Sequence, residues 1–440
     1  MLKEITLKNF KLHKDTKLNF GKITLFIGPN NSGKSSAFHA MQVLKKQIVR
    51  HADKFIDVDI NYFNDLIRHK EHSFELKISG TVPIKNILSP SEIEIAKSFI
   101  ADDKINVFSA YTLKNGNFLP KYKIEFLTYG FEILEYEKDK KIKNRIYTKD
   151  CGSKKSKIII EEDNSIEIFN KDGEVLWLGS LSESFNGLDS TSHRGNDNVQ
   201  EILKTILSSP GQLIKSFHFV YPIRGFEWQA YDIVESKESS KLNLDNISIE
   251  QRAKSIVNEF HYNRYFEDEI YEKMKDVVDV KFFADPLTKD KVRLISKKVG
   301  IPFLFEGLGS HQMLFILLPI ALAESNETIF IEEPENHLHP KAQYELTKLF
   351  TEISEKQEKQ LVMTTHSEHI VFGFLNQVAK KKLKKDELRI YYFENNDGVA
   401  EVKELKVNEF GQVDGGLPGF FEAKFERLLE FLNEPEGEDK

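Results

Sequence analysis

The chain lacks the features that mark secreted and membrane proteins. It has a single cysteine, Cys151, among 440 residues, so no disulfide can form within the chain and a reducing compartment is favoured. Its longest strongly apolar run, 313–323, is too short to span a bilayer. The first segment, 2–10, alternates apolar and charged residues and does not read as a signal peptide. We therefore predict a cytoplasmic protein without a membrane partner.

The chain also lacks an excess of positive charge and a long heptad pattern. Lys and Arg total 62 against 69 Asp and Glu, for a net charge of −7, so no overall attraction to nucleic acid is expected. Basic runs at 138–145 and 380–385 are typical of solvated faces. Nucleic acid is a possible partner, but the net charge gives no indication of it. No heptad run lasts three repeats, which argues against a long coiled-coil arm.

A phosphate-binding motif is present near the start. Residues 28–35 (GPNNSGKS) match G-x-x-x-x-G-K-[ST] in full, after the strand-like run 22–27 and before the helix-compatible run 35–44. In this arrangement loop amides and the helix start point at phosphates. Lys34 would bridge the β- and γ-phosphates, and the Ser35 hydroxyl would bind Mg²⁺. The predicted ATP-binding residues are Asn30, Asn31, Ser32, Gly33, Lys34, Ser35 and Ser36.

Two adjacent carboxylates follow an apolar strand much later in the chain. The run 329–331 (IFI) leads into Glu332 and Glu333, and Pro334 then ends the strand. A buried strand rarely delivers paired carboxylates without a partner for them, because unpaired buried charge is costly. A metal-bound nucleotide is the usual partner. We therefore predict that Glu332 binds Mg²⁺ and that Glu333 is the catalytic base or orients the attacking water. Glu335, beyond the proline, is interpreted as a surface or dimer-contact residue.

Three segments together resemble the ATPase head of ABC-type proteins. They are 28–36 (GPNNSGKSS), 332–340 (EEPENHLHP) and 361–367 (LVMTTHS). The version is similar to that of SMC-like and overcoming-lysogenization-defect (OLD) ATPases, in which glutamate also occurs where most ABC proteins have aspartate. The resemblance implies an α/β fold, an ABC-type P-loop ATPase head with a mixed sheet core. It implies ATP and Mg²⁺ as ligands, and it makes His366, at the end of a strand, a catalytic switch residue that senses the γ-phosphate.

Two further predictions also rest on this resemblance. The segment 307–312 (GLGSHQ) resembles a degenerate signature loop, which implies that Gly309, Ser310 and Gln312 complete the ATP site of a second copy in a homodimer or larger homo-oligomer. The alternative is a glycine-rich turn before a buried helix. Arg224, after the strand-like run 217–220, is a candidate contact to the nucleotide or to the other protomer. A salt bridge inside the fold is an equal alternative for it.

The sequence suggests an ATPase core divided by an insertion. We predict an N-terminal core part at 1–80, an insertion at 81–284 and a C-terminal core part at 285–440. The insertion reads as antiparallel β over 105–178 and as helical over 197–280. A glutamine loop is not placed by the sequence, although its expected region is 61–68.

Functionally, the resemblance implies an OLD-type ATPase without its Toprim nuclease. No D-x-D triplet follows residue 367, and Toprim nucleases need such a carboxylate cluster. We therefore expect ATP hydrolysis but no intrinsic nuclease activity. The leading hypothesis is a sensor or switch subunit that controls a separate effector, such as a nuclease, in anti-phage defence. The alternative is a repair or recombination ATPase that acts on DNA directly, and a transporter ATPase is a weaker third reading.

Overall fold

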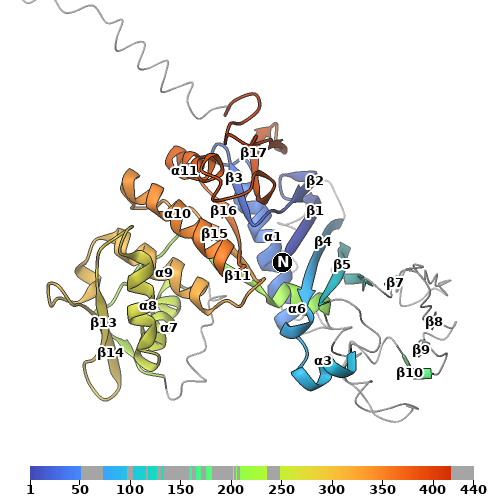
Figure 1. Ribbon diagram of the computed structural model, residues 1–440, viewed down its shortest axis with the longest axis horizontal. Helices are drawn as coiled ribbons and strands as arrows, with labels where there is room; N and C mark the ends of the chain where they lie inside the picture. Colours follow the sequence, from blue (N-terminus) through green and yellow to red (C-terminus); the bar gives the residue numbers. More distant parts are fainter. Residues whose placement is uncertain are drawn as a thin grey trace, which may run out of the picture. The chain divides into compact units, whose positions relative to one another are not determined.

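The computed structural model describes most of the chain outside its central segment and its C-terminal end (Figure 1). The described residues are 1–50, 73–96, 103–114, 117–125, 130–132, 158–160, 165–169, 175–180, 202, 205, 209–234 and 248–417. Cys151, the basic run 138–145 and the region 61–68 lie outside them. The chain forms two compact units, unit 1 (Met1–Phe20, Ser35–His218, Glu324–Thr328) and unit 2 (Gly21–Lys34, Phe219–Ala323, Ile329–Lys440).

A six-stranded mixed sheet is the centre of unit 2. Its order is β11 (Phe217–Val220), β15 (Thr328–Glu332), β16 (Gln360–Thr364), β3 (Ile23–Ile27), β17 (Leu388–Asn396) and β18 (Val399–Leu405). β3 runs parallel to both β16 and β17, whereas β18 is antiparallel to β17. Every residue of β3, β15 and β16 is buried, as expected for strands covered on both faces.

The ends of these buried strands are aligned at one edge of the sheet. The Glu333 amide, just after β15, donates to the Thr364 carbonyl at the end of β16 (3.0 Å). The Thr365 amide donates in turn to the Phe26 carbonyl in β3 (3.0 Å). Residues that follow β15, β16 and β3 are therefore brought to the same edge, although more than 300 positions separate the first from the last along the chain.

Two helices follow strands of this sheet, and they pack closely. α10 (Pro340–Lys356) and α11 (Glu368–Ala379) cross at Gly373, where an added Cβ would lie 2.4 Å from Thr347 Oγ1. α10 begins after His339, whose side chain accepts from the Lys341 amide, and α11 begins after the N-cap Ser367, whose hydroxyl accepts from the Ile370 amide. The helix starts are thus fixed next to the edge where the strands end.

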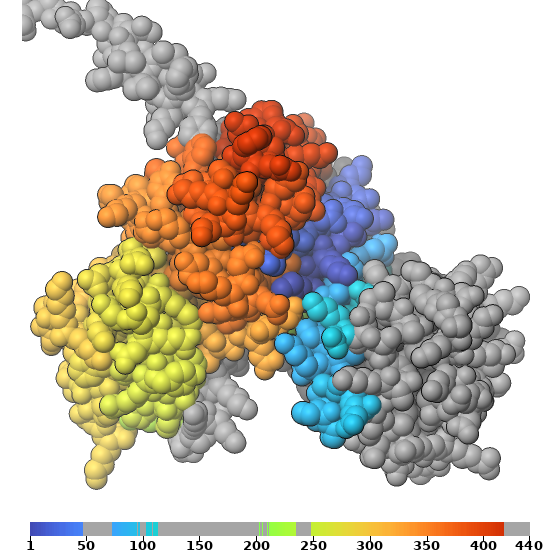
Figure 2. All heavy atoms as spheres, viewed as in Figure 1, coloured from blue at the N-terminus to red at the C-terminus, as the bar shows by residue number. Residues whose placement is uncertain are grey.

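A second part of unit 2 packs helices on a small antiparallel sheet (Figure 2, yellow to light orange). The sheet order is β12 (Tyr231–Asp232), β14 (Lys291–Ser296) and β13 (Phe282–Pro286); the helices are α7 (Ile249–Tyr262), α8 (Tyr265–Met274) and α9 (Leu308–Leu322), with a 3₁₀ turn η2 (Phe303–Phe305). Aromatic contacts join these elements, since the Phe282 ring packs on Phe260 and on Phe303. α9 is apolar around most of its circumference and is buried accordingly.

Unit 1 is built on an antiparallel sheet. Its order is β2 (His13–Asn19), β1 (Leu2–Phe10), β4 (Ser73–Pro83), β5 (Lys104–Lys114), β6 (Asn117–Glu125) and β7 (Gly130–Glu132). A separate sheet has the order β10 (Val175–Ser180), β9 (Ser165–Phe169) and β8 (Ile158–Ile160); the helical elements are α1 (Lys34–Arg50), η1 (Ile84–Asn86), α3 (Pro90–Ala96) and α6 (Ser209–Lys215). β4 alternates buried and less buried residues over much of its length, the pattern of a strand with one covered face.

The architecture confirms the α/β ATPase-head fold class. A P-loop lies between β3 and α1, next to a mixed sheet. The boundary at residue 80 falls inside β4, and the boundary at residue 284 falls inside β13. β4 pairs with β5, and β13 pairs with β14, so each strand joins residues on both sides of a predicted boundary. No helix in the described ranges is both long and apolar enough to cross a membrane.

Candidate nucleotide site

The phosphate-loop segment has the backbone that its glycines predict. Gly28 follows β3 at φ 136°, and an added Cβ would lie 2.1 Å from the Phe393 carbonyl oxygen. Asn31 and Gly33 also have positive φ, 59° and 102°, a region that glycine and asparagine tolerate. The Asn395 side chain donates to the Asn31 carbonyl (2.9 Å). The neighbouring strand β17 therefore supports the loop at two points, close to Gly28 through Phe393 and at Asn31 through Asn395.

Lys34 ends the loop and turns back over it. Its Nζ donates to the Gly28 carbonyl (2.9 Å) and the Pro29 carbonyl (2.7 Å). Burial lowers the Lys34 pKa from 10.5 to about 8, while Glu333 and Glu335 act to raise it. Neutral carbonyls are weaker partners for an ammonium group than phosphate oxygens. The amine is thus placed where a phosphate group would be a better ligand than the loop itself.

The residues 332–336, named here the carboxylate turn, lie at the end of β15. Glu333 has a left-handed backbone (φ 48°), which is uncommon for a residue other than glycine. Its amide bonds to Thr364, and its carbonyl accepts from Arg224 Nη2 (2.5 Å) and from the Asn336 amide (3.2 Å). These three neighbours hold the Glu333 backbone in its unusual conformation.

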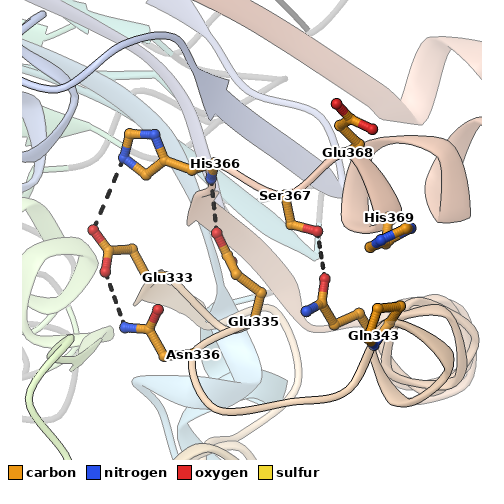
Figure 3. Close-up of a pocket in the computed structure, with 9 residues that line it drawn as sticks. Glu333, Glu335, Asn336, Gln343, His366, Ser367, Glu368 and His369 are labelled. Atoms are coloured by element: carbon orange, nitrogen blue, oxygen red, sulfur yellow. Dashed lines mark hydrogen bonds and ion pairs between the residues drawn. The ribbon is translucent and has the colours of Figure 1, made fainter. Parts of the chain in front are cut away.

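The Glu333 side chain faces His366 across an open cleft (Figure 3). Asn336 Nδ2 donates to Glu333 Oε2 (2.9 Å), and His366 Nε2 lies 4.0 Å from Glu333 Oε1. The His366 pKa is lowered by burial and by Lys34, and Glu333 opposes this shift. The cleft has a volume of about 510 Å³, and its lining comprises Glu333, Glu335, Asn336, Pro340, Gln343, His366, Ser367, Glu368 and His369. The structure therefore brings the predicted base and the predicted switch histidine together.

Glu335, which the sequence suggested as a surface or dimer-contact residue, is partly buried and turns toward the end of β16. Its Oε1 accepts from the His366 amide (2.7 Å), and its Oε2 is buried (Figure 3). Burial raises the Glu335 pKa. The turn made by Pro334 directs this side chain back toward the end of β16, where it fixes the backbone of the switch histidine.

Arg224 lies in the interior, close to the carboxylate turn. It is 6% exposed, and burial lowers its pKa to about 10 while Glu335, Glu333 and Glu332 act to raise it. Nη2 bonds to the Glu333 carbonyl, whereas Nε and Nη1 are buried without a hydrogen-bond partner in the part of the chain that the structure describes. A buried guanidinium with unpaired N–H groups costs free energy. An anion that accepted hydrogen bonds from Nε and Nη1 would remove this cost.

The signature segment lies at the start of the buried helix α9. α9 begins at Leu308, and Gly309 packs so closely that an added Cβ would lie 3.1 Å from the His337 carbonyl oxygen. Ser310 is 3% exposed and Gln312 is 1% exposed, with Gln312 Nε2 donating to the Arg224 carbonyl (3.3 Å). The buried helix turns both side chains inward. The exposed residues at this helix start are Gly307 and Leu308.

The residues fit a Mg²⁺-bound nucleotide. Ser35 is exposed at the second position of α1, and Glu332 is the last residue of β15. A hydroxyl and a carboxylate are the oxygen donors that Mg²⁺ prefers. The loop glycines allow close approach of a phosphate. ATP phosphates and Mg²⁺ would therefore both find suitable ligands in this chain.

Sequence reasoning missed two residues that act on Glu333. Thr364 receives the Glu333 amide at both its carbonyl and its Oγ1 (3.0 and 3.3 Å), and Asn336 binds the carboxylate. Thr364 carried no local signal, since its role depends on strand alignment. Asn336 did carry one, because a residue three positions after Glu333, across a proline, is placed by a tight turn to reach back.

Comparison with known proteins gives one family match and several structural likenesses. The family model described as "AAA ATPase domain" matches residues 1–371. The SMC head domain from Thermotoga maritima has 12% identity and a TM-score of 0.40, with 92% of this chain and 99% of that chain covered. An SMC head bound to the C-winged helix domain of ScpA has 14% identity, TM-score 0.43 and coverage of 93% and 98%. An SMC head with an extended coiled coil, bound to the C-terminal domain of ScpA derived from Pyrococcus furiosus, has 12% identity, TM-score 0.42 and coverage of 98% and 99%. A search of curated proteins found no match.

Proposed function

Because this chain belongs to the AAA ATPase domain family, we propose that it is an ATP-driven switch that hydrolyses ATP between two copies of itself and controls a separate effector. The observation that carries the proposal is that three residues distant along the chain follow strands that end at the same edge of one sheet. Glu333 acts to raise the pKa of Lys34, and the His366 pKa responds to both, with His366 Nε2 lying 4.0 Å from Glu333 Oε1 at one edge of the unit 2 sheet. A cation, a carboxylate and a histidine together are suited to bind a triphosphate, activate a water and respond to the γ-phosphate.

Each residue has a defined part in the reaction. Lys34 exchanges its loop carbonyls for phosphate oxygens when ATP binds. Glu333 orients a water and accepts its proton through the carboxylate oxygen that faces His366. His366, whose backbone is fixed by Glu335, contacts the γ-phosphate side and reports its loss. Mg²⁺, held by Ser35 and Glu332, would neutralise charge on the β- and γ-phosphates. Arg224 adds positive charge behind the turn through its unpaired N–H groups.

The second copy completes the site through the start of α9. Leu308 is 50% exposed at the first position of this helix, where free backbone N–H groups favour an anion. The contact comes from Gly307–Gly309 rather than from the buried Ser310 and Gln312 side chains. ATP would then lie between the P-loop of one protomer and the α9 start of its partner.

A complementation experiment tests this arrangement. Leu308→Arg should block turnover by clash without weakening nucleotide binding, whereas Phe410→Arg, at a side chain 76% exposed elsewhere in unit 2, should have no effect. Mixing Leu308→Arg chains with Lys34→Ala chains should restore about a quarter of the parental turnover, since half the dimers are mixed and each has one intact site. No recovery, when mixed dimers are shown to form, would contradict the shared site.

The effector is a separate nuclease, and the biological setting is anti-phage defence. This part of the proposal is supported by the resemblance of the three ATPase motifs to OLD-like ATPases, and by the commitment of Glu332 and Glu333 to the nucleotide. Purified chain should not cleave plasmid or tRNA with Mg²⁺. Cells carrying the native locus should lose protection against phage when Glu333→Gln is introduced. Undiminished protection would contradict the switch.

The same protein can be assayed for direct action on DNA. ATP turnover should be unchanged by duplex DNA at low and at high salt. Stimulation by DNA that falls steeply as salt rises would instead favour a repair or recombination ATPase that binds the phosphate backbone.

A further inference from the structure

We propose that Asn336 is a positioning residue for ATP hydrolysis, which holds the Glu333 carboxylate so that one oxygen remains directed at the attacking water. The inference rests on the proposed role of Glu333. Asn336 acts through a hydrogen bond from its Nδ2 to Glu333 Oε2 (2.9 Å).

The turn places the Asn336 amide where it is needed. Glu333, Pro334, Glu335 and Asn336 form a four-residue turn, closed by the Asn336 amide on the Glu333 carbonyl (3.2 Å). Proline at the second position fixes φ, as this turn favours. The side chains at the first and fourth positions are thereby brought to the same side. Asn336 therefore reaches the Glu333 carboxylate without any change in backbone (Figure 3).

The bond also has a direction that suits catalysis. A carboxylate only accepts hydrogen bonds, so the Asn336 amide nitrogen must be the donor. An amide donor cannot remove the proton that the carboxylate later accepts. With Oε2 engaged, Oε1 is left facing His366 Nε2 at 4.0 Å, which is beyond hydrogen-bond distance. Oε1 therefore keeps its lone pairs for a water molecule.

Backbone contacts alone would not fix this carboxylate. Thr364 and Arg224 hold the Glu333 backbone, but a glutamate side chain has three further torsions. Catalytic groups lose much of their effect when misplaced by about 1 Å. Asn336 restricts these torsions by binding the carboxylate itself. Removal of the Asn336 amide should therefore lower turnover without lowering the affinity for ATP.

Two substitutions separate positioning from packing. Asn336→Ala should lower kcat about 10- to 100-fold, the size expected for one hydrogen bond to a charged group, with the ATP dissociation constant changed less than about twofold. Asn336→Asp keeps the shape but replaces the donor with a second carboxylate, so kcat should fall at least as far. Asn376→Ala, at an exposed position of α11, is the matched control. An Asn336→Asp chain with parental kcat would overturn the proposal.

A double-mutant cycle in single-turnover conditions is the decisive experiment. If Asn336 acts through Glu333, adding Asn336→Ala to Glu333→Gln should slow the residual hydrolysis by less than about twofold. The same substitution in the parental chain should slow hydrolysis about 10- to 100-fold. Multiplying effects would overturn the proposal and assign Asn336 an independent role. If Asn336→Ala retains full activity while Glu333→Gln is inactive, only this inference fails. If Glu333→Gln itself hydrolyses ATP at the parental rate, the proposed function fails as well.

Discussion

The P-loop and the carboxylate turn follow strands of the same kind but are held by different kinds of contact. β3 and β15 are both five-residue strands that are buried throughout, and both are followed by a residue with positive φ. At the P-loop this residue is Gly28, and Lys34 is bound by carbonyls within six positions of it. At the carboxylate turn it is Glu333, whose left-handed backbone is one that glycine adopts at lower cost.

The difference lies in how far away the supporting residues are. The Lys34 amine is bound by local carbonyls, although β17 also supports the loop backbone through Asn395. Glu333 depends on Arg224, 109 positions earlier, and on Thr364 and His366, more than 30 positions later. A local motif suffices to bind phosphate, whereas the hydrolytic group needs several strands to be aligned first. We infer that binding and hydrolysis can be lost separately, and the predictions follow from this division.

The largest effect is expected for Lys34→Ala. Removal of the amine takes away a charge-assisted contact to the phosphates, so ATP affinity should fall about 100-fold or more and turnover should no longer be detectable. A fluorescent ATP analogue titrated into the purified chain measures the affinity. Lys356→Ala, on the exposed side of α10, is the control. Parental affinity in the Lys34→Ala chain would show that the loop is not the phosphate site.

A smaller effect, which also reaches stability, is expected for Gly28→Ala. The added Cβ would lie 2.1 Å from the Phe393 carbonyl oxygen at a φ of 136°, so the loop must shift, and the free energy of unfolding should fall by about 1–3 kcal/mol. ATP affinity should fall with it. Gly300→Ala is the matched control, since that residue has φ 74° but nothing within 4 Å of an added Cβ. If Gly28→Ala and Gly300→Ala lose the same free energy of unfolding in chemical denaturation, backbone strain at positive φ, and not contact with β17, governs position 28.

The smallest effect concerns the reactivity of Lys34. With a pKa of about 8 against the usual 10.5, its amine should be uncharged in a fraction roughly 100-fold larger than an ordinary lysine at pH 8. Reductive methylation followed by mass spectrometry should therefore modify Lys34 early, and ATP should protect it. As the pH is raised toward 10 the preference for Lys34 should shrink, because ordinary lysines then lose their protons as well. Modification that ATP leaves unchanged would argue against contact with phosphate.

The contrast between the two regions also explains what the sequence could predict. The P-loop, β15 with its carboxylates, and His366 were all found from short patterns, because buried strands and their ends are local features. The direction of the α9 side chains was not, since Gln312 is turned inward by the packing of a helix that is apolar all round. The inward turn of Glu335 was likewise set by the end of β16, 31 positions away. Pairing across the sheet likewise places residues 80 and 284, the predicted boundaries, inside strands β4 and β13.

Glu333→Gln tests most directly whether the two regions divide binding from hydrolysis. The substitution keeps the shape and the backbone contacts of the residue but removes its charge. We predict an ATP dissociation constant within about threefold of the parental value and turnover below about 1% of it, the range in which loss of a general base is usually found. Both quantities should be measured on the same preparation. Turnover close to the parental rate, or loss of ATP binding together with turnover, would contradict the account.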